Sequence, residues 1–293
     1  MKFTTKALAL CASVAALIGA MPQRVEAQAT MLDCPASGTI SLEELEANFG
    51  GSCKGTPTVY GLTFYEMGLC QSDPMASGTL DRAAGGCFAT FENASGEYHD
   101  IAGASVTLGS DEGTERPGDG TYNVAYVIIA NQFTLEGSYA FTANSAGAAA
   151  PFTNLAGATY ASNGLTTPNA PGDPTNITAG GTPTTFTELL TSFAGSTTCD
   201  PDWAEPQNNG TLNAYIASGS ISSGLTTDTS CSTSASTIVG ALVLNSPITI
   251  DSATTGLQVD FSVTNNGMSI FSQNDGPGGF GSGPFSATFT VLE

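Results

Sequence analysis

Alternating apolar and polar positions mark several segments of the chain as β-strands. In Leu257–Val263 the four apolar side chains occupy every second position, and Phe285–Val291 alternates in the same way. Residues 132–141 repeat this pattern with aromatic and aliphatic side chains at every second position. Because successive side chains of a strand point to opposite faces, each segment predicts a strand with one buried face.

Other segments are apolar at consecutive positions. Val59–Tyr65 and Tyr122–Ile129 are rich in β-branched and aromatic residues, which is typical of central strands that are covered on both faces. Further strands are predicted at 212–217, 238–244 and 248–250. No strict repeat of 20–50 residues occurs, which argues against a solenoid or propeller.

Two short helices are predicted. Ser41–Phe49 combines a Ser-x-x-Glu capping box with apolar residues at helical spacing, and Gly50 and Gly51 follow it. Residues 185–190 repeat the capping-box pattern. The expected fold class is therefore all-β: an antiparallel β-sandwich, as one large or two smaller domains, with one or two short helices.

The pattern also suggests how the chain is organised. A cysteine-bounded segment at 30–56 precedes a first β-sandwich domain or half at 57–142. Residues 143–184 are rich in Gly, Pro and Thr, and we interpret them as a linker or long loop with one weak strand near 152–160. A second β-rich domain or half is expected at 185–293.

Residues 1–29 have the features of a secretory signal peptide. A basic start is followed by an apolar run over 7–20 and by small residues at Ala27 and Ala29. The run is shorter than the ~20 residues that a spanning helix needs, and no later stretch reaches that length. We therefore expect no membrane span and a secreted location, in the periplasm, at the cell surface or outside the cell.

Six cysteines follow the signal peptide, and an even number in an exported chain predicts up to three disulfides. Pairing neighbours along the chain closes the shortest loops. A structural zinc site is the rival interpretation, but no C-x-x-C pair occurs and His99 is the only histidine. The expected pairs are Cys34–Cys53, Cys70–Cys87 and Cys199–Cys231.

The charge restricts the partners. Removing residues 1–29 takes away three of the six basic and one of the 26 acidic residues, which leaves a net charge of −22. Such a surface repels phosphate backbones and excludes nucleic-acid binding. Cations, neutral glycans or another copy of the chain remain as partners.

Known catalytic motifs are absent from the sequence. His99 stands alone, no Gly-x-Ser-x-Gly elbow occurs, and Lys54 lies outside any Ser-x-x-Lys motif. We assign no catalytic residue. Carboxylate-only chemistry, as in glycosidases, stays open because the chain has many acids.

Two features could bind ligands. Clustered carboxylates suit calcium, which takes six to eight oxygen ligands, and a solvated acidic loop is the alternative interpretation. Trp203, four residues after Cys199, is either a sugar-stacking platform or a core side chain packed on a disulfide. The calcium ligands proposed in the first acidic loop are Asp111, Glu112, Glu115 and Asp119. A second loop at 200–205 holds three more acids.

One resemblance involves loose motifs over about half of the chain. A strand that begins at 56–60 and ends in Cys70, together with the turn at 117–122 and Gly276–Phe280, resembles an arrangement in uncharacterised secreted β-sandwich proteins of aquatic bacteria and phages. The extra Asp119 and Gly120 depart from the tighter Pro-Gly-x-Tyr turn of that arrangement. The resemblance implies a sandwich fold and no activity.

Together these observations favour an exported, non-enzymatic structural or binding protein of the cell surface or extracellular space. Exposed edge strands could support self-association. The alternative is a carbohydrate-binding or carbohydrate-active protein that uses carboxylates, with or without calcium.

Overall fold

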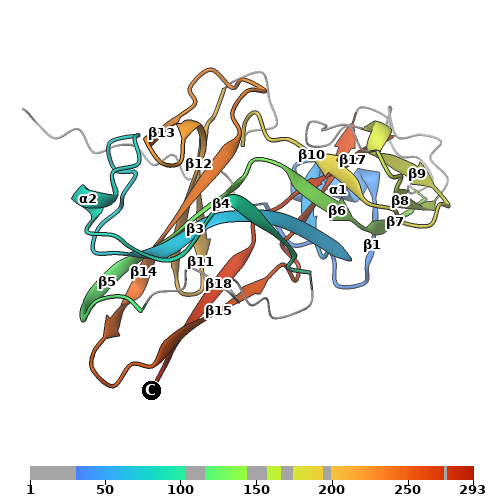
Figure 1. Ribbon diagram of the computed structural model, residues 1–293. Coiled ribbons are helices and arrows are strands. Elements are labelled where there is room, and N and C mark those ends of the chain that lie inside the picture. Colours follow the sequence, from blue (N-terminus) through green and yellow to red (C-terminus); the bar gives the residue numbers. More distant parts are fainter. Residues whose placement is uncertain (1–30, 103–115, 144–156, 166–173, 194–198, 274–275) are drawn as a thin grey trace, which may run out of the picture.

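The structure, a computed structural model, describes residues 31–102, 116–143, 157–165, 174–193, 199–273 and 276–293. It is mostly strands, arranged in several packed and largely antiparallel sheets, so the predicted all-β, sandwich-like class is confirmed (Figure 1). The signal peptide predicted at 1–29 lies outside the described residues.

A nine-stranded sheet forms the centre of the molecule. Its middle strands β5 and β14 pair in antiparallel register, with Ile129 opposite Ile238, and a bulge interrupts the ladder after Val243. β3 pairs with β4, β5 and β6. The strands of this sheet are β3 (Val59–Cys70), β4 (Phe88–Asp100), β5 (Gly120–Ala130), β6 (Phe133–Glu136), β10 (Phe186–Glu188), β11 (Asp202–Gln207), β12 (Gly210–Ser220), β13 (Gly224–Thr227) and β14 (Thr237–Ile250).

Both faces of the central sheet are covered, which explains why β5 and β14 are apolar at consecutive positions. Ile128 and Val239 pack with Met75 and Leu80 from the segment that also holds α2 (Arg82–Gly85). The opposite face packs against two smaller sheets, the hairpin of β15 (Gly256–Ser262) with β18 (Ser286–Leu292), and the sheet of β2 (Ser52–Gly55), β16 (Met268–Gln273) and β17 (Gly276–Ser282).

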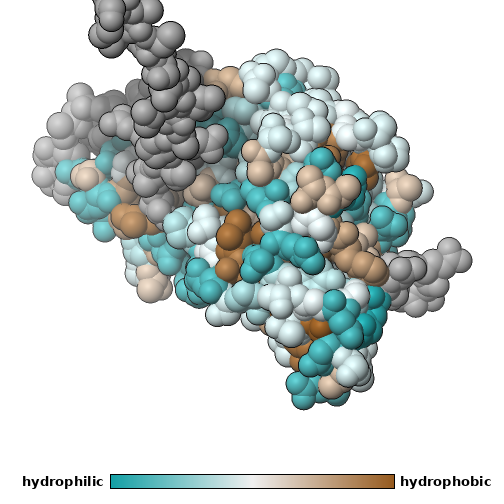
Figure 2. Space-filling model, turned by 90° about the vertical axis from the view of Figure 1, so that its left-hand side faces the viewer, coloured by the Kyte–Doolittle hydropathy of each residue, from teal (hydrophilic) through white to brown (hydrophobic). Residues whose placement is uncertain are grey.

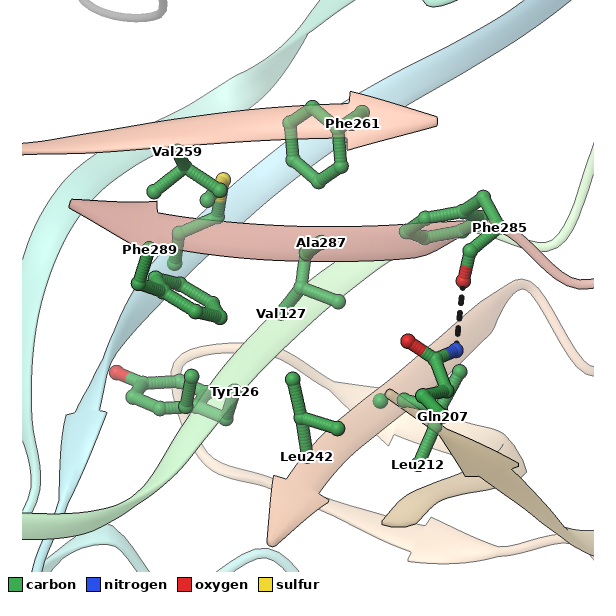
Figure 3. A pocket seen from close by; sticks show the side chains of 13 residues that line it. Tyr126, Val127, Gln207, Leu212, Leu242, Val259, Phe261, Phe285, Ala287 and Phe289 are labelled. Atoms are coloured by element: carbon green, nitrogen blue, oxygen red, sulfur yellow. Dashed lines mark hydrogen bonds between the residues drawn. The ribbon is translucent and has the colours of Figure 1, made fainter. Parts of the chain in front are cut away.

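Figure 3 shows how the β15–β18 hairpin meets the central sheet. Val259, Phe261 and Phe289 of the hairpin approach Val127 and Leu242 of the sheet, and only about 30 Å³ is left between the two layers. The Gln207 side chain donates a hydrogen bond of 2.9 Å to the Phe285 carbonyl. We call the contact between the β15–β18 hairpin and the central sheet the seam.

A four-stranded sheet lies at the other end of the molecule (Figure 1). Its first pair is parallel, with Ile40 opposite Phe141, and the other pairs are antiparallel. Part of it comes from 143–184, the region interpreted as a linker or long loop with a weak strand. The elements are β1 (Thr39–Ser41), β7 (Ser138–Thr142), β8 (Ala158–Ser162) and β9 (Ile177–Ala179), with the 3-10 turn η1 (Pro174–Asn176) before β9.

The first predicted helix is confirmed as α1 (Leu42–Phe49). The Ser41 hydroxyl accepts a hydrogen bond of 3.0 Å from the Glu44 amide, which is the capping contact that the sequence predicts. Gly50 ends the helix with φ of 64°, a left-handed conformation that glycine adopts without steric cost.

The second predicted helix, at 185–190, is wrong. Residues Phe186–Glu188 form β10, which pairs antiparallel with β6. Phe186, Glu188 and Leu190 are all buried, so every second side chain points inward, as in a strand. Thr185 and Glu188 fit the capping-box pattern, but Phe186, Glu188 and Leu190 also have the period of two that the strand follows.

All three predicted disulfides are present: Cys34–Cys53, Cys70–Cys87 and Cys199–Cys231. The first joins the N-terminal segment to β2, and the second joins the end of β3 to the start of β4. Each closes a loop of fewer than 35 residues, as loop length predicts.

The surface that Figure 2 shows is mainly hydrophilic or intermediate, and hydrophobic residues occur on it in small separate groups. In the described ranges, no helix is long and apolar enough to cross a membrane.

Candidate functional site

An aromatic-lined hollow lies between the central sheet and the β2–β16–β17 sheet. It has a volume of about 520 Å³. Strands β5, β11, β12 and β14 supply its floor, and the C-terminal end of α1 and the segment around Phe193 border it. We call this hollow the cavity. Its aromatic lining consists of Tyr60, Phe133, Phe193, Trp203, Phe271 and Phe285.

A buried ion pair crosses the cavity from one layer to the other. Lys54 of β2 places Nζ 3.2 Å from Oε1 of Glu205 on β11, and both side chains are at most 10% exposed. The next carboxylate, Asp33, lies 3.9 Å from the same nitrogen and is exposed. An ion pair in so dry a setting is stable only when both charges are matched and hydrogen-bonded.

Trp203 is fixed beside this pair. Its indole Nε1 donates a hydrogen bond of 3.2 Å to Oε2 of Glu205, two residues along β11. Residues i and i+2 of a strand share a face, so the alternation of β11 puts both side chains on the cavity side. Because the indole N–H is used internally, the ring can offer a ligand only its apolar surface.

Tyr60 closes the cavity at the junction between β17 and β18. Its hydroxyl donates a hydrogen bond of 2.6 Å to the Gly283 carbonyl, and its ring contacts Phe133 and Phe285 edge-on. Burial, and then the nearby Glu188 carboxylate, raise the pKa of Tyr60 well above its ordinary value. Tyr60 therefore stays a neutral part of the wall.

Glu188 lies behind that wall and is fully buried. Its Oε2 accepts a hydrogen bond from the Ser282 amide, while Oε1 has no partner among the described residues. Burial raises the pKa of Glu188 to about 7, although the Ser282 amide opposes this shift. The carboxyl group therefore changes charge near neutral pH inside the protein.

Another hollow, with a more polar lining, lies on the opposite face of the central sheet, between β3, β4 and the β12–β13 turn. There Arg82 donates two hydrogen bonds to Glu66, of 2.6 and 2.5 Å, and the Tyr126 hydroxyl donates a third of 2.5 Å. Arg82 also donates to the Ile221 carbonyl at 3.0 Å. The hydrogen bond to Glu66 raises the pKa of Arg82, so the guanidinium stays charged. Its hydrogen bonds tie α2 to β3 and to the β12–β13 turn, which is a framework role.

The predicted calcium ligands are only partly described. Asp111, Glu112 and Glu115 lie outside the described residues, and Asp119 accepts a hydrogen bond of 2.6 Å from Arg116. In the second acidic loop, Asp202 and Glu205 point to opposite faces of β11, and Glu205 forms an ion pair with Lys54. Over the described ranges, no three His, Cys, Asp or Glu side chains are grouped so that they could hold a metal ion.

Trp203, which the sequence suggests as a ligand-binding residue, lies at the cavity wall. His99 lies on the outer strand β4, where its Nε2 is 2.5 Å from Oε1 of Glu97. The sequence reasoning missed Lys54, Glu205 and the aromatic residues around them. One signal was available: Lys54 is one of only three basic residues after residue 29, and a scarce cation in so acidic a chain is expected to pair with a carboxylate.

Comparison with known proteins gives no relative: the chain matches no family model, no curated protein and no solved structure. The function must therefore be argued from the site itself.

Proposed function

We propose that this chain is an exported, non-enzymatic binding protein that holds a small ligand in the cavity between its layers. The observation that carries the proposal is the combination of a hollow of about 520 Å³ with aromatic walls and one fixed ion pair. Small-molecule sites have volumes of about 300–1,000 Å³, mostly apolar linings and a few convergent polar groups.

A packing defect is a poor explanation for the cavity. Protein interiors are close-packed and rarely keep voids much larger than a water molecule. On the same face of the central sheet, the β15–β18 hairpin leaves only about 30 Å³ at the seam, so this face can be covered closely. A hollow with a desolvated ion pair in its wall is better explained by an occupant.

The chemistry of the wall suits binding better than catalysis. Lys54 and Glu205 neutralise each other, and Glu205 is further held by the Trp203 indole. General acid–base catalysis needs a group that is free to exchange a proton with the substrate. Groups locked in this way are suited to orienting a ligand.

Three observations support export. The first 29 residues have the pattern of a signal peptide. The chain forms three disulfides, which persist in oxidising compartments. The strongly acidic composition fits a protein that keeps away from nucleic acids and anionic membrane surfaces.

The test uses Trp203, the only tryptophan in the sequence, as a fluorescent reporter of the cavity. The purified chain is titrated with neutral sugars, amino acids, nucleobases and short fatty acids, while the Trp203 emission is recorded. We expect one class to change the emission saturably and to raise the melting temperature, as a native-state ligand must.

A matched pair of variants locates the binding. Ala214→Leu adds bulk to the cavity floor, whereas Asn213→Leu adds similar bulk on the other face of β12. We expect Ala214→Leu to weaken binding at least tenfold and Asn213→Leu to leave it unchanged. If no class changes the emission, or if Ala214→Leu binds as well as the native chain, the proposal is wrong.

A further inference from the structure

The ion pair in the cavity offers hydrogen-bond donors and acceptors side by side. Lys54 has three N–H donors, and the only hydrogen bond from its Nζ to a described residue goes to Glu205. Among the described residues, Oε1 of Glu205 accepts a hydrogen bond from Lys54 and Oε2 accepts one from Trp203, so each oxygen keeps a further lone pair. Spare donors and spare acceptors therefore lie about one hydrogen-bond length apart.

This arrangement matches neighbouring hydroxyl groups. A hydroxyl both donates and accepts, so two adjacent hydroxyls can bind an ammonium and a carboxylate together. A cationic group that contacts Glu205 would also lie against the Lys54 ammonium, 3.2 Å away, and an anion would meet Glu205 and the rim carboxylate of Glu46. A wholly apolar ligand would leave the pair's remaining donors and acceptors unsatisfied, which costs affinity.

The aromatic walls complete the match. The polar atoms of Trp203 and Tyr60 are both used internally, by Glu205 and by the Gly283 carbonyl, so the two rings offer only apolar surface. A sugar ring has this dual character, with C–H groups on its faces and hydroxyls around its edge. Beside the pair, Trp203 can pack on the face while Lys54 and Glu205 bind the edge.

We infer that the ligand of the cavity is a neutral saccharide, stacked on Trp203 with adjacent hydroxyls bound by Lys54 and Glu205. This inference rests on the proposed binding function and names the ligand class of the same site.

The experiment compares neutral sugars with charged counterparts of the same shape. Glucose, galactose, mannose, N-acetylglucosamine and their disaccharides are titrated against the native chain, together with glucuronate and glucosamine. Binding is followed by Trp203 emission and by calorimetry. We expect at least one neutral sugar to bind saturably, and about tenfold more tightly than its charged counterparts, because a site built for hydroxyls discriminates against misfitting groups.

Variants test the assigned contacts. Glu205→Gln keeps the shape but removes the carboxylate, and we expect at least tenfold weaker sugar binding by calorimetry. Asp202→Asn, an exposed neighbour of opposite parity on β11, should leave binding unchanged. Trp203→Ala should abolish binding, which keeps the inference testable if Glu205→Gln does not fold.

The outcomes separate this inference from the proposed function. If amino acids, nucleobases or fatty acids bind in a manner that Ala214→Leu blocks, while no sugar does, the saccharide assignment is wrong and the binding function stands. Tighter binding of glucuronate or glucosamine, or full affinity in Glu205→Gln, would also overturn it. If no class binds, both proposals fail.

Discussion

The face of the central sheet that packs on the two smaller sheets is closely covered at the β15–β18 hairpin and hollow at the β2–β16–β17 sheet. At the seam the layers leave about 30 Å³, whereas the cavity holds about 520 Å³. Leu212 and Phe285 border both regions, so the change occurs within a few residues.

Side-chain size accounts for the closed end. Gly240 of β14 lines the seam and leaves the hairpin no side chain to displace at this position. Ala125 and Ala287 also line it, so small residues let the two layers approach. At the hollow end a salt bridge between β2 and β11 joins the layers across the cavity instead. The comparison indicates that the cavity is spanned by polar contacts rather than left by poor packing.

Breaking the ion pair should have the largest effect. Lys54→Met leaves the Glu205 carboxylate buried without its charge partner, which costs about 3–5 kcal/mol of unfolding free energy. Urea unfolding measures the loss. Lys54→Met combined with Glu205→Gln should recover most of it, because no unpaired charge remains. A loss below about 1 kcal/mol for Lys54→Met would show that water, not the pair, stabilises the hollow end.

Raising the pH should lower the stability of the folded chain through Glu188, which lies behind the cavity wall. The folded-state pKa of Glu188, about 7, lies above the ordinary value of 4.5, so the folded state binds this proton more tightly than the unfolded state. Stability should therefore fall as the pH rises from about 4.5 through 7 and level off above, by about 3 kcal/mol. Glu188→Gln imitates the protonated form.

The relevant measurement is the difference in unfolding free energy between Glu188→Gln and the native chain, from pH 4 to pH 9. We expect it to be near zero at pH 4 and to favour the variant by about 3 kcal/mol at pH 8. A constant difference across this range would contradict buried ionisation at Glu188.

Truncating one aromatic residue in each region should separate the two ends. Phe289 at the seam and Phe271 at the cavity are both half-buried. Phe289→Ala removes contacts between packed layers and should cost about 3 kcal/mol, whereas Phe271→Ala borders a space that already exists and should cost about 1 kcal/mol. Equal losses in thermal unfolding would mean that the cavity wall is packed as tightly as the seam.

Salt should give the smallest effect. The acidic surface repels itself, and added KCl screens this repulsion, so the melting temperature of the native chain should rise by a few degrees. The buried Lys54–Glu205 pair is only weakly screened by salt. The difference in melting temperature between the native chain and Lys54→Met should therefore stay constant as KCl is added. If this difference becomes smaller as KCl is added, the ion pair is exposed to solvent.

The sequence predicted the strands better than their arrangement. The alternation of apolar and polar residues is a local signal, and it predicts β15 and β18 to within one residue. The disulfides are predicted by pairing cysteines that are close in the sequence. The cavity depends on residues such as Lys54 and Glu205, which are 151 positions apart, and no local pattern joins them. The sequence marks Trp203 as an isolated tryptophan, but its partner Glu205 falls in the second acidic segment at 200–205, where the alternation of β11 is not apparent from the sequence.

The use of every cation after residue 29 in internal contacts has a practical consequence. Lys54 pairs with Glu205, Arg82 with Glu66, and Arg116 with Asp119 and the Thr254 carbonyl. A protease that cleaves only after basic residues finds two sites in residues 30–293, after Lys54 and Arg82, because Pro117 blocks the bond after Arg116. Both of these side chains are held in ion pairs. Digestion by such an enzyme would require local opening of the fold, so the folded chain should persist where trypsin-like enzymes are abundant.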